Sequence, residues 1–452
     1  MGIQIDNPLG TQKVSSLLHR FALPSIVAML VSSLYNIVDQ FFIGHSVGEL
    51  GNAATNISFP LSISCVAIAL LFGIGGSSAF NISMGLGQTI AEEKKKAVYF
   101  MGNALFMMVF CGTVLLAVTQ LFLQQLMVFF GSSREVLGYA SVYTRIVSIG
   151  FPFVIVATGG GHLLRADGRP KLTMLCNLVG AVINTALDAL FVFGFQWGMA
   201  GAAWATVIAQ GISVVLCVLY VLARVCILIP EKKHFAVGSH LYWELFSQSI
   251  SMGLMSSIVS AGSVVLQYGI NGLGTLTIAG HTAARKLFAF TDMPLISMAN
   301  AGSTFVSQNR GANQPDRVRR GMRQMYLYSV VVMVAAVVLM SFGAEWMVQL
   351  ISGSSEPIVL ENGARYLLWN APFYAVLGVL LCTRYALQSL GQKVLPLFSS
   401  VIELVGKVIF VLVFIPKFQY NAVILCEPII WCFMTAYLVA VYLHEPFVFP
   451  KK

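Results

Sequence analysis

The sequence predicts an all-α polytopic membrane protein, with twelve transmembrane helices in two pseudo-symmetric six-helix lobes around a central cavity. Three observations lead to this fold class. Hydrophobic residues make up 57% of the 452 residues and charged residues only 10%, whereas soluble proteins average about 25% charged. Most of the apolar runs are long enough to cross the roughly 30 Å hydrocarbon core of a bilayer. Short sequence motifs in the first half of the chain also recur, in the same order, in the second half.

The apolar runs define the predicted helices. The alternating hydrophobicity of outer-membrane strands is absent from them, and the first run is too long for a removable signal peptide. An even number of spans places both termini on one side of the membrane. The predicted spans cover residues 17–43, 53–81, 97–121, 135–163, 172–196, 199–223, 241–270, 276–306, 324–350, 357–383, 394–416 and 420–443.

Basic residues fall mostly in the loops on one side, which the positive-inside rule assigns to the cytoplasm together with both termini. The opposite loops carry few, and Arg134 and Lys417 are the clear exceptions. The net charge of +9 follows from this topology. We do not expect nucleic acid as a partner, because the basic residues occupy short loops between helices rather than a folded basic domain.

The eight cysteines are scattered singly through the spans without CxxC spacing. Small apolar packing residues explain this pattern better than a metal or disulfide framework does.

Segment 229–240 differs in composition from its surroundings and separates a predicted N-terminal lobe, residues 1–228, from a C-terminal lobe, residues 241–452. We interpret it as a cytoplasmic linker. Each lobe has six spans, so the repeat is parallel and its axis runs along the membrane normal. Lobes of this kind commonly enclose a midplane binding site and alternate its access by moving as two bodies.

The spacing between an arginine and a proline illustrates the repeat. In span 4, Arg145 is followed after six residues by Pro152, and in span 10 Arg365 is followed after six residues by Pro372. Proline removes a backbone hydrogen bond inside a helix, so a bend is expected at both places.

Asp39 lies inside the first predicted span. An ionised carboxylate there costs at least ~2.5 kcal/mol, and such residues usually mark ion or substrate pathways. In span 5, Asn184 and Asp188 are four residues apart and share a helix face. Counting along the alternating spans puts Asp39, Asp188 and Thr206 of span 6 in the outer half of the bilayer, where they could meet.

Two neighbouring carboxylates in a low dielectric cannot both stay ionised without a counterion. Such a pair takes up protons as one coupled unit, or it binds a hard cation such as Na⁺ through carboxylate, amide and hydroxyl oxygens. The alternative is a hydrogen-bonded pair that only joins spans 1 and 5. In the repeat, the counterparts of Asp39 and Asp188 are Val265 and Val411, so the acidic cluster is predicted in the first half alone.

Two further groups of intramembrane charges have simpler interpretations. Glu403 and Lys407 are four residues apart in the stabilising order and should neutralise one another. Span 8 carries a set with a candidate internal ion pair: His281, Arg285, Lys286 and Asp292.

Three residues are candidates for the substrate cavity. Asp292 lies near the middle of span 8, and Tyr35, followed by Asn36, lies one turn from Asp39 on the same helix face. Aromatic faces suit apolar cations, although helix packing is an alternative role for Tyr35.

The two-lobe pattern, the Tyr35-Asn-Ile-Val-Asp39 segment, the Asn184 and Asp188 pair and the Gly198–Thr206 segment resemble the multidrug and toxic compound extrusion (MATE) transporters. The resemblance covers essentially the whole chain and is closest to the bacterial DinF/MepA-like branch. It implies that Asp39, Asn184, Asp188 and Thr206 form the coupling site, for H⁺ or for Na⁺, with no other cofactor.

The resemblance further implies export of cationic, amphipathic drugs, which confers antibiotic resistance. The expected setting is the lipid of the bacterial inner membrane, and the expected state is a monomer. Another branch uses acids in spans 7 and 10, but span 7 here offers only Gln248 and Gln267 at interior depth. A second-lobe coupling site is therefore not expected.

Two alternatives belong to other function classes. A flippase for lipid-linked oligosaccharides or other anionic lipids predicts a cavity lined with Arg and Lys, whereas only Arg285, Lys286 and Lys407 lie deep in the spans. A membrane-embedded enzyme would need a constellation such as HExxH or GxSxG. Neither motif occurs, so we do not expect an enzyme.

Overall fold

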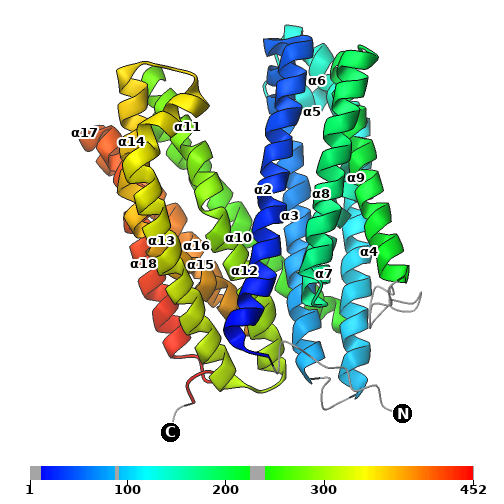
Figure 1. The fold of residues 1–452 in the computed structure, drawn as a ribbon, viewed down its shortest axis with the longest axis vertical. Coiled ribbons are helices and arrows are strands. Elements are labelled where there is room, and N and C mark those ends of the chain that lie inside the picture. The colour runs from blue at the N-terminus through cyan, green and yellow to red at the C-terminus, as the bar shows by residue number, and fades with distance from the viewer. Residues whose placement is uncertain (1–11, 87–90, 224–239, 451–452) are drawn as a thin grey trace. The chain divides into compact units, whose positions relative to one another are not determined.

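The computed structural model describes residues 12–86, 91–223 and 240–450, and within these ranges the chain is helical without a single strand (Figure 1). This confirms the predicted all-α fold class. The predicted linker, residues 229–240, lies outside the described residues except for His240.

The first six predicted spans correspond to long helices with defined interruptions. Span 4 is split by a 3₁₀ turn, and span 5 ends in a π-helix. The elements are α2 (Val14–Val47), α3 (Glu49–Leu86), α4 (Ala91–Leu121), the short α5 (Leu123–Phe129), α6 (Arg134–Val147), η1 (Ser148–Gly150), α7 (Phe151–Ala166), α8 (Pro170–Asp188), η2 (Ala189–Gly194) and α9 (Gly198–Ala223).

The second six spans repeat this plan. Span 10 is split by a 3₁₀ turn and span 11 runs into a π-helix, as spans 4 and 5 do. The elements are α10 (His240–Asn271), α11 (Thr275–Thr291), α12 (Met293–Gly311), α13 (Pro315–Ser352), α14 (Pro357–Asn370), η4 (Ala371–Phe373), α15 (Tyr374–Ser389), α16 (Leu395–Ile409), η5 (Phe410–Phe414), α17 (Ile415–Phe418) and α18 (Tyr420–Leu443).

Eleven helical segments in the described part of the chain are long and apolar enough to cross a membrane. The predicted span 276–306 is the one that differs, because it consists of α11 and α12, which are separated at Asp292. Pro294 stands in the first turn of α12, where its missing N–H leaves no hydrogen bond unmade.

Contacts divide the chain into two compact units. One comprises residues 24–253, and the other comprises residues 1–23 and 254–452. The boundaries fall inside α2 and α10, so each of these helices contributes one segment to each unit. In the first unit α3 packs on α4 and α7, and α8 packs on α9; in the second, α12 packs on α15, and α11 packs on α14.

Close helix approach in the first unit depends on glycine. A Cβ atom added at Gly73 of α3 would lie 2.7 Å from the Cα of Gly159 on α7. Small residues at such contacts let transmembrane helices approach closely, which supplies packing where lipid provides no hydrophobic driving force.

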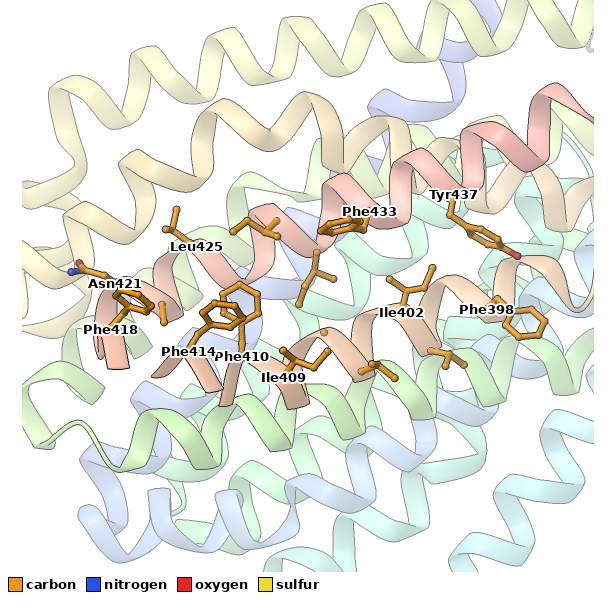
Figure 2. A pocket seen from close by; sticks show the side chains of 16 residues that line it. Phe398, Ile402, Ile409, Phe410, Phe414, Phe418, Asn421, Leu425, Phe433 and Tyr437 are labelled. Atoms are coloured by element: carbon orange, nitrogen blue, oxygen red, sulfur yellow. The ribbon is translucent and has the colours of Figure 1, made fainter. Parts of the chain in front are cut away.

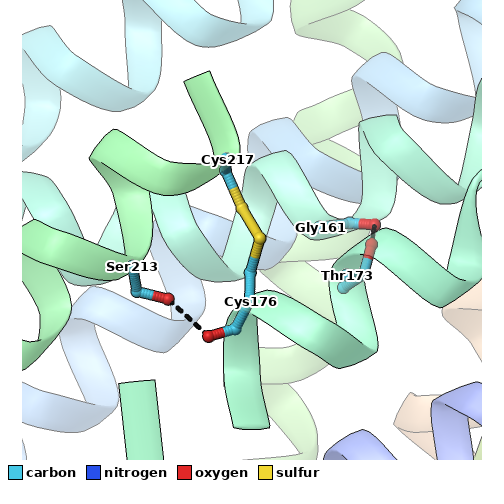
Figure 3. The surroundings of a disulfide bond; sticks show 5 residues. All are labelled: Gly161, Thr173, Cys176, Ser213 and Cys217. Atoms are coloured by element: carbon cyan, nitrogen blue, oxygen red, sulfur yellow. Dashed lines mark hydrogen bonds between the residues drawn. A yellow bond between two sulfur atoms is a disulfide. The ribbon is translucent and has the colours of Figure 1, made fainter. Parts of the chain in front are cut away.

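One prediction about the cysteines is wrong. The structure joins Cys176 of α8 to Cys217 of α9 in a disulfide bond (Figure 3). The Oγ of Ser213, one turn from Cys217, donates a hydrogen bond to the carbonyl oxygen of Cys176 at 2.8 Å. The two cysteines are 41 residues apart in sequence, and only the antiparallel pairing of α8 with α9 brings them together.

Candidate functional site

Two buried carboxylates lie close together in the unit formed by residues 24–253. Asp39 comes from α2 and is 7% exposed, and Asp188 is the last residue of α8 and is fully buried. The two side chains are near enough to interact electrostatically. The basic residues of these two helices, Arg20 of α2 and Lys171 of α8, lie several turns away along the chain and do not neighbour the carboxylates.

An amide and a hydroxyl adjoin this pair. Asn184 lies one turn before Asp188 on α8, and its Nδ2 donates a hydrogen bond to Oγ1 of Thr206 on α9 at 3.4 Å. In this orientation the amide oxygen of Asn184 has no hydrogen-bond partner. Asn184 is buried, whereas Thr206 is half-buried.

Four oxygens of this group are buried without a hydrogen-bond partner: Oδ1 of Asp39, Oδ1 of Asn184 and both carboxylate oxygens of Asp188. A buried acceptor with no donor is costly, and a buried charge without a partner is more so. A proton on a carboxylate or a hard cation among these oxygens would remove that cost. The donor set is all oxygen, which fits Na⁺ as a transported ion, and it fits H⁺ equally well.

Three further polar side chains border the carboxylates. Tyr35 of α2 interacts electrostatically with Asp39 and Asp188, and its hydroxyl lies near the side chain of Gln210 of α9. Tyr143 of α6 interacts with both carboxylates as well. Tyr143 and Gln210 were not among the sequence candidates, because neither stands at a helical spacing from Asp39 or Asp188.

The remaining candidates lie elsewhere. Asn36 is exposed, and its Nδ2 donates to the carbonyl oxygen of Ser32 at 2.7 Å within its own helix. Asp292 is half-buried and belongs to the other unit, at the break between α11 and α12.

The unit containing residues 254–452 holds a buried network of charges, of which the sequence revealed one pair. Arg285 of α11 pairs with Glu427 of α18 at 2.8 Å, rather than with a residue of its own span as predicted. Tyr366 donates a hydrogen bond to Oε2 of Glu427 at 2.7 Å. Glu427 is 6% exposed, so this unit also contains a buried acid, which unlike Asp39 and Asp188 has cationic partners. Its charged neighbours offset the cost of burying this carboxylate.

The network continues through α16. The predicted pair of Lys407 and Glu403 is confirmed, with Nζ to Oε1 at 2.8 Å. Lys407 also lies 3.8 Å from Glu427, and Glu403 lies 4.0 Å from the guanidinium of Arg384 on α15.

A cavity of about 760 Å³ opens between α16 and α18 of the same unit (Figure 2). Its walls are almost entirely apolar, and Phe398, Phe414 and Phe433 are among the aromatic side chains that line it. It contains no charged residue and lies in a different unit from Asp39 and Asp188. Lipid acyl chains suit such a surface better than a charged substrate does.

The MatE family profile matches residues 24–190 and 252–413. The chain belongs to the MatE family. One matched segment lies in each half of the chain. The first segment contains Asp39, Asn184 and Asp188.

Curated MatE-like relatives of this chain include two multidrug export proteins named MepA. The protein from Staphylococcus saprophyticus is 23% identical over 64% of this chain and 63% of its own length. The protein from Staphylococcus haemolyticus is 23% identical over 76% of this chain and 74% of its own length. The chain therefore spans somewhat less than two thirds of the first relative.

Solved structures share the MatE fold. An outward-facing multidrug resistance MATE transporter of the MOP superfamily aligns with a TM-score of 0.90 at 18% identity, covering 98% of both chains. A MOP superfamily transporter from Pyrococcus furiosus, described as having a binding pocket of reversed polarity, aligns with a TM-score of 0.88 at 18% identity over 96% of this chain and 97% of its own. A mutant of the Vibrio cholerae MATE transporter VcmN aligns with a TM-score of 0.84 at 18% identity, over 96% of this chain and 99% of its own.

Proposed function

We propose that this MatE protein is a secondary active transporter that exports cationic, amphipathic drugs by antiport with H⁺ or Na⁺. One observation carries the proposal: Asp39 and Asp188 lie together, buried, with carboxylate oxygens that have no hydrogen-bond partner. Intramembrane acids of this kind typically serve ion pathways. The names of the two MepA relatives, multidrug export proteins, support the substrate class.

In the proposed cycle, Asp39 and Asp188 take up the ion from outside while the drug leaves. Neutralising the pair removes the cost of two buried carboxylates, so the ion-loaded state differs in free energy from the empty one. The transporter then turns its binding site inward, releases the ion and takes up another drug molecule. Asn184 and Thr206 supply the amide and hydroxyl oxygens next to the carboxylates.

The proposed setting is the bacterial inner membrane, with both termini cytoplasmic and a monomer surrounded by lipid. The flippase alternative needs unpaired cations in a cavity. Of the three deep cations, Arg285 and Lys407 have glutamate partners at 2.8 Å, which makes them less available to an anionic lipid. Lys286 is exposed and forms no ion pair with the described residues.

Ethidium efflux from membrane vesicles tests the proposal. A pH gradient and a Na⁺ gradient are imposed separately on vesicles that contain the protein. Under the proposal, one gradient alone sustains efflux and thereby identifies the coupling ion. Efflux that requires neither gradient would contradict antiport, and the absence of efflux under both would contradict the proposed drug class.

A further inference from the structure

The apolar cavity between α16 and α18 is a long groove on the surface of its unit (Figure 2). On the α16 side its lining runs from Phe398 to Phe418, a stretch that rises about 30 Å at 1.5 Å per residue. The hydrocarbon core of a bilayer is also about 30 Å thick. Val405 is 50% exposed and Phe433 is 67% exposed, so the groove is open along its side. Its length and composition fit an extended acyl chain.

The two polar side chains that line the groove lie at its opposite ends (Figure 2). The hydroxyl of Tyr437 donates a hydrogen bond to the carbonyl oxygen of Leu395 at 3.2 Å. At the other end, Oδ1 of Asn421 accepts a hydrogen bond from Nη2 of Arg365 on α14 at 2.7 Å. Apolar ligand sites commonly use a few polar groups to fix the orientation of the ligand. Here one end of the groove is bonded directly to a cation.

Arg365 has unused donors at this end of the groove. Its side chain is 41% exposed, and within the described chain only its Nη2 forms a hydrogen bond, the one to Asn421. The carboxylate of Glu361 lies 3.7 Å from Nη1 and is 68% exposed, and ion pairs at such exposed positions contribute little. The remaining N–H groups of the planar guanidinium are therefore available to a phosphate, which they fit in bidentate fashion.

A second cation lies at the same end. Lys417 is exposed and directly precedes Phe418 of the groove lining. The positive-inside rule does not explain this lysine, because the proposed topology places it outside. Lys393, near the other end of the groove, follows the rule. Together with Glu361, Arg365 and Lys417 leave one positive charge in excess, which an anionic headgroup would balance.

We propose that the groove binds one anionic glycerophospholipid, with an acyl chain along α16 and α18 and the phosphate on Arg365 and Lys417. The lining contains no charged residue, which suits a hydrocarbon chain and disfavours a charged drug along its length. In the proposed orientation the lipid belongs to the outer leaflet. The site lies within residues 254–452 and does not depend on the proposed export function.

Native mass spectrometry of the purified full chain in detergent tests this assignment. The protein is titrated with palmitoyl-oleoyl phosphatidylglycerol, or with the phosphatidylcholine of the same acyl chains, whose choline group balances the phosphate. The fraction with one lipid bound gives a dissociation constant for each. We expect phosphatidylglycerol to bind about tenfold more tightly, the size of one charge-assisted hydrogen bond. Equal affinities, or tighter binding of phosphatidylcholine, would overturn the proposal.

Charge variants locate the headgroup. The double variant Arg365→Gln/Lys417→Gln should weaken phosphatidylglycerol binding about tenfold and leave phosphatidylcholine binding unchanged. Asn421→Asp keeps the size of the side chain and its bond to Arg365 but cancels the charge, so it should have the same effect. Arg134→Gln, at an exposed position of the other unit, should change neither affinity. An unchanged lipid preference in the double variant and in Asn421→Asp would remove these cations from the site.

A groove variant locates the acyl chain. Val405→Trp fills the groove from an exposed position, so both lipids should bind about tenfold more weakly, as expected for the loss of a few methylene contacts. Val331→Trp on α13, where the native side chain is 59% exposed, is the matched control and should change neither affinity. If only the charge variants weaken binding, or if inorganic phosphate competes as strongly as the lipid, the cations bind a phosphate without the groove, contrary to the proposal.

Two further outcomes would also contradict it. Weaker phosphatidylglycerol binding in Lys393→Gln, with normal binding in the Arg365 and Lys417 double variant, would place the headgroup at the opposite end of the groove. A wild-type dimer that Val405→Trp converts to a monomer would mean that a second copy of the chain covers this face instead of a lipid.

Discussion

Asn184 on α8 donates a hydrogen bond to the hydroxyl of Thr206 on α9, and this contact leaves the Asn184 carbonyl oxygen buried without a donor. In this arrangement the amide nitrogen faces the Thr206 hydroxyl, and the amide oxygen remains available to a cation. An amide oxygen held next to an acid is a ligand for a hard cation, whereas an amide nitrogen in that place would repel one.

Thr206→Val should therefore weaken ion coupling without unfolding the protein. Valine has nearly the same shape but lacks the hydroxyl, so the amide is no longer held. We expect the ion concentration that gives half-maximal ethidium efflux to rise about three- to tenfold, which corresponds to one lost hydrogen bond. Thr113→Val is the matched control, since that exposed threonine bonds only to Val109 of its own helix. An unchanged ion dependence in Thr206→Val would contradict the assignment.

Asp39→Asn and Asp188→Asn should each abolish gradient-driven efflux while the protein remains folded. Asparagine fills the same space but can neither take up a proton nor bring a charge to the site. Because neither substitution buries an unpaired charge, the melting temperature should stay the same or rise. Glu345→Gln, at an exposed position of α13, serves as the control. Wild-type efflux in either aspartate variant would remove these residues from the coupling role.

Tyr366→Phe should destabilise the protein. The Tyr366 hydroxyl donates to Glu427 at 2.7 Å, and this side chain is only 1% exposed. Its loss leaves a buried carboxylate oxygen short of a donor, at a cost of about 1–3 kcal/mol in the free energy of unfolding. Tyr268→Phe, where the ring is 79% exposed, should have almost no effect. Denaturation in detergent micelles measures both, and equal stability of the two variants would contradict the role of Tyr366.

Gly73→Ala should also be destabilising, by about 1–3 kcal/mol as in other overpacked cores. The added methyl group would meet the backbone of Gly159 at 2.7 Å, so α3 and α7 would have to separate. Gly211→Ala on α9 meets no atom within 4 Å, and alanine should stabilise that helix by up to about 1 kcal/mol. The same denaturation measurement compares the two, and the opposite order of stability would show that close packing at Gly73 is unimportant.

Much of the fold could be predicted from the sequence, because membrane helices carry their signal locally. Apolar length identified the spans, and Pro152 and Pro372 marked two places beside which the helices change to 3₁₀ geometry. The break at Asp292 was missed, since the surrounding residues remain apolar enough to pass as one span. The grouping of Asp39 with Asp188 followed from their depth alone, because spans 1 and 5 cross the membrane in the same direction and both residues lie in the later half of their span.

Contacts between distant helices could not be predicted in this way. Glu427 is 142 residues from Arg285, and neither residue has an oppositely charged neighbour one turn away that would reveal the pair. The disulfide between Cys176 and Cys217 was missed for the same reason. Lys407 and Glu403 were predicted correctly because their contact lies within a single helix.

The π-helix that follows Asp188 has a consequence for how this chain tolerates changes in length. A π turn holds about one residue more than the α turn it replaces, so residues 189–194 contain a local surplus. Removing one residue there would restore regular winding without shifting anything that precedes it. A deletion anywhere between residues 171 and 187 would instead rotate Asp188 away from its neighbours by roughly 100°. Libraries of single-residue deletions should therefore show a narrow permissive window immediately after the carboxylate, and a second one at residues 410–414, where the other half of the chain carries the same irregularity.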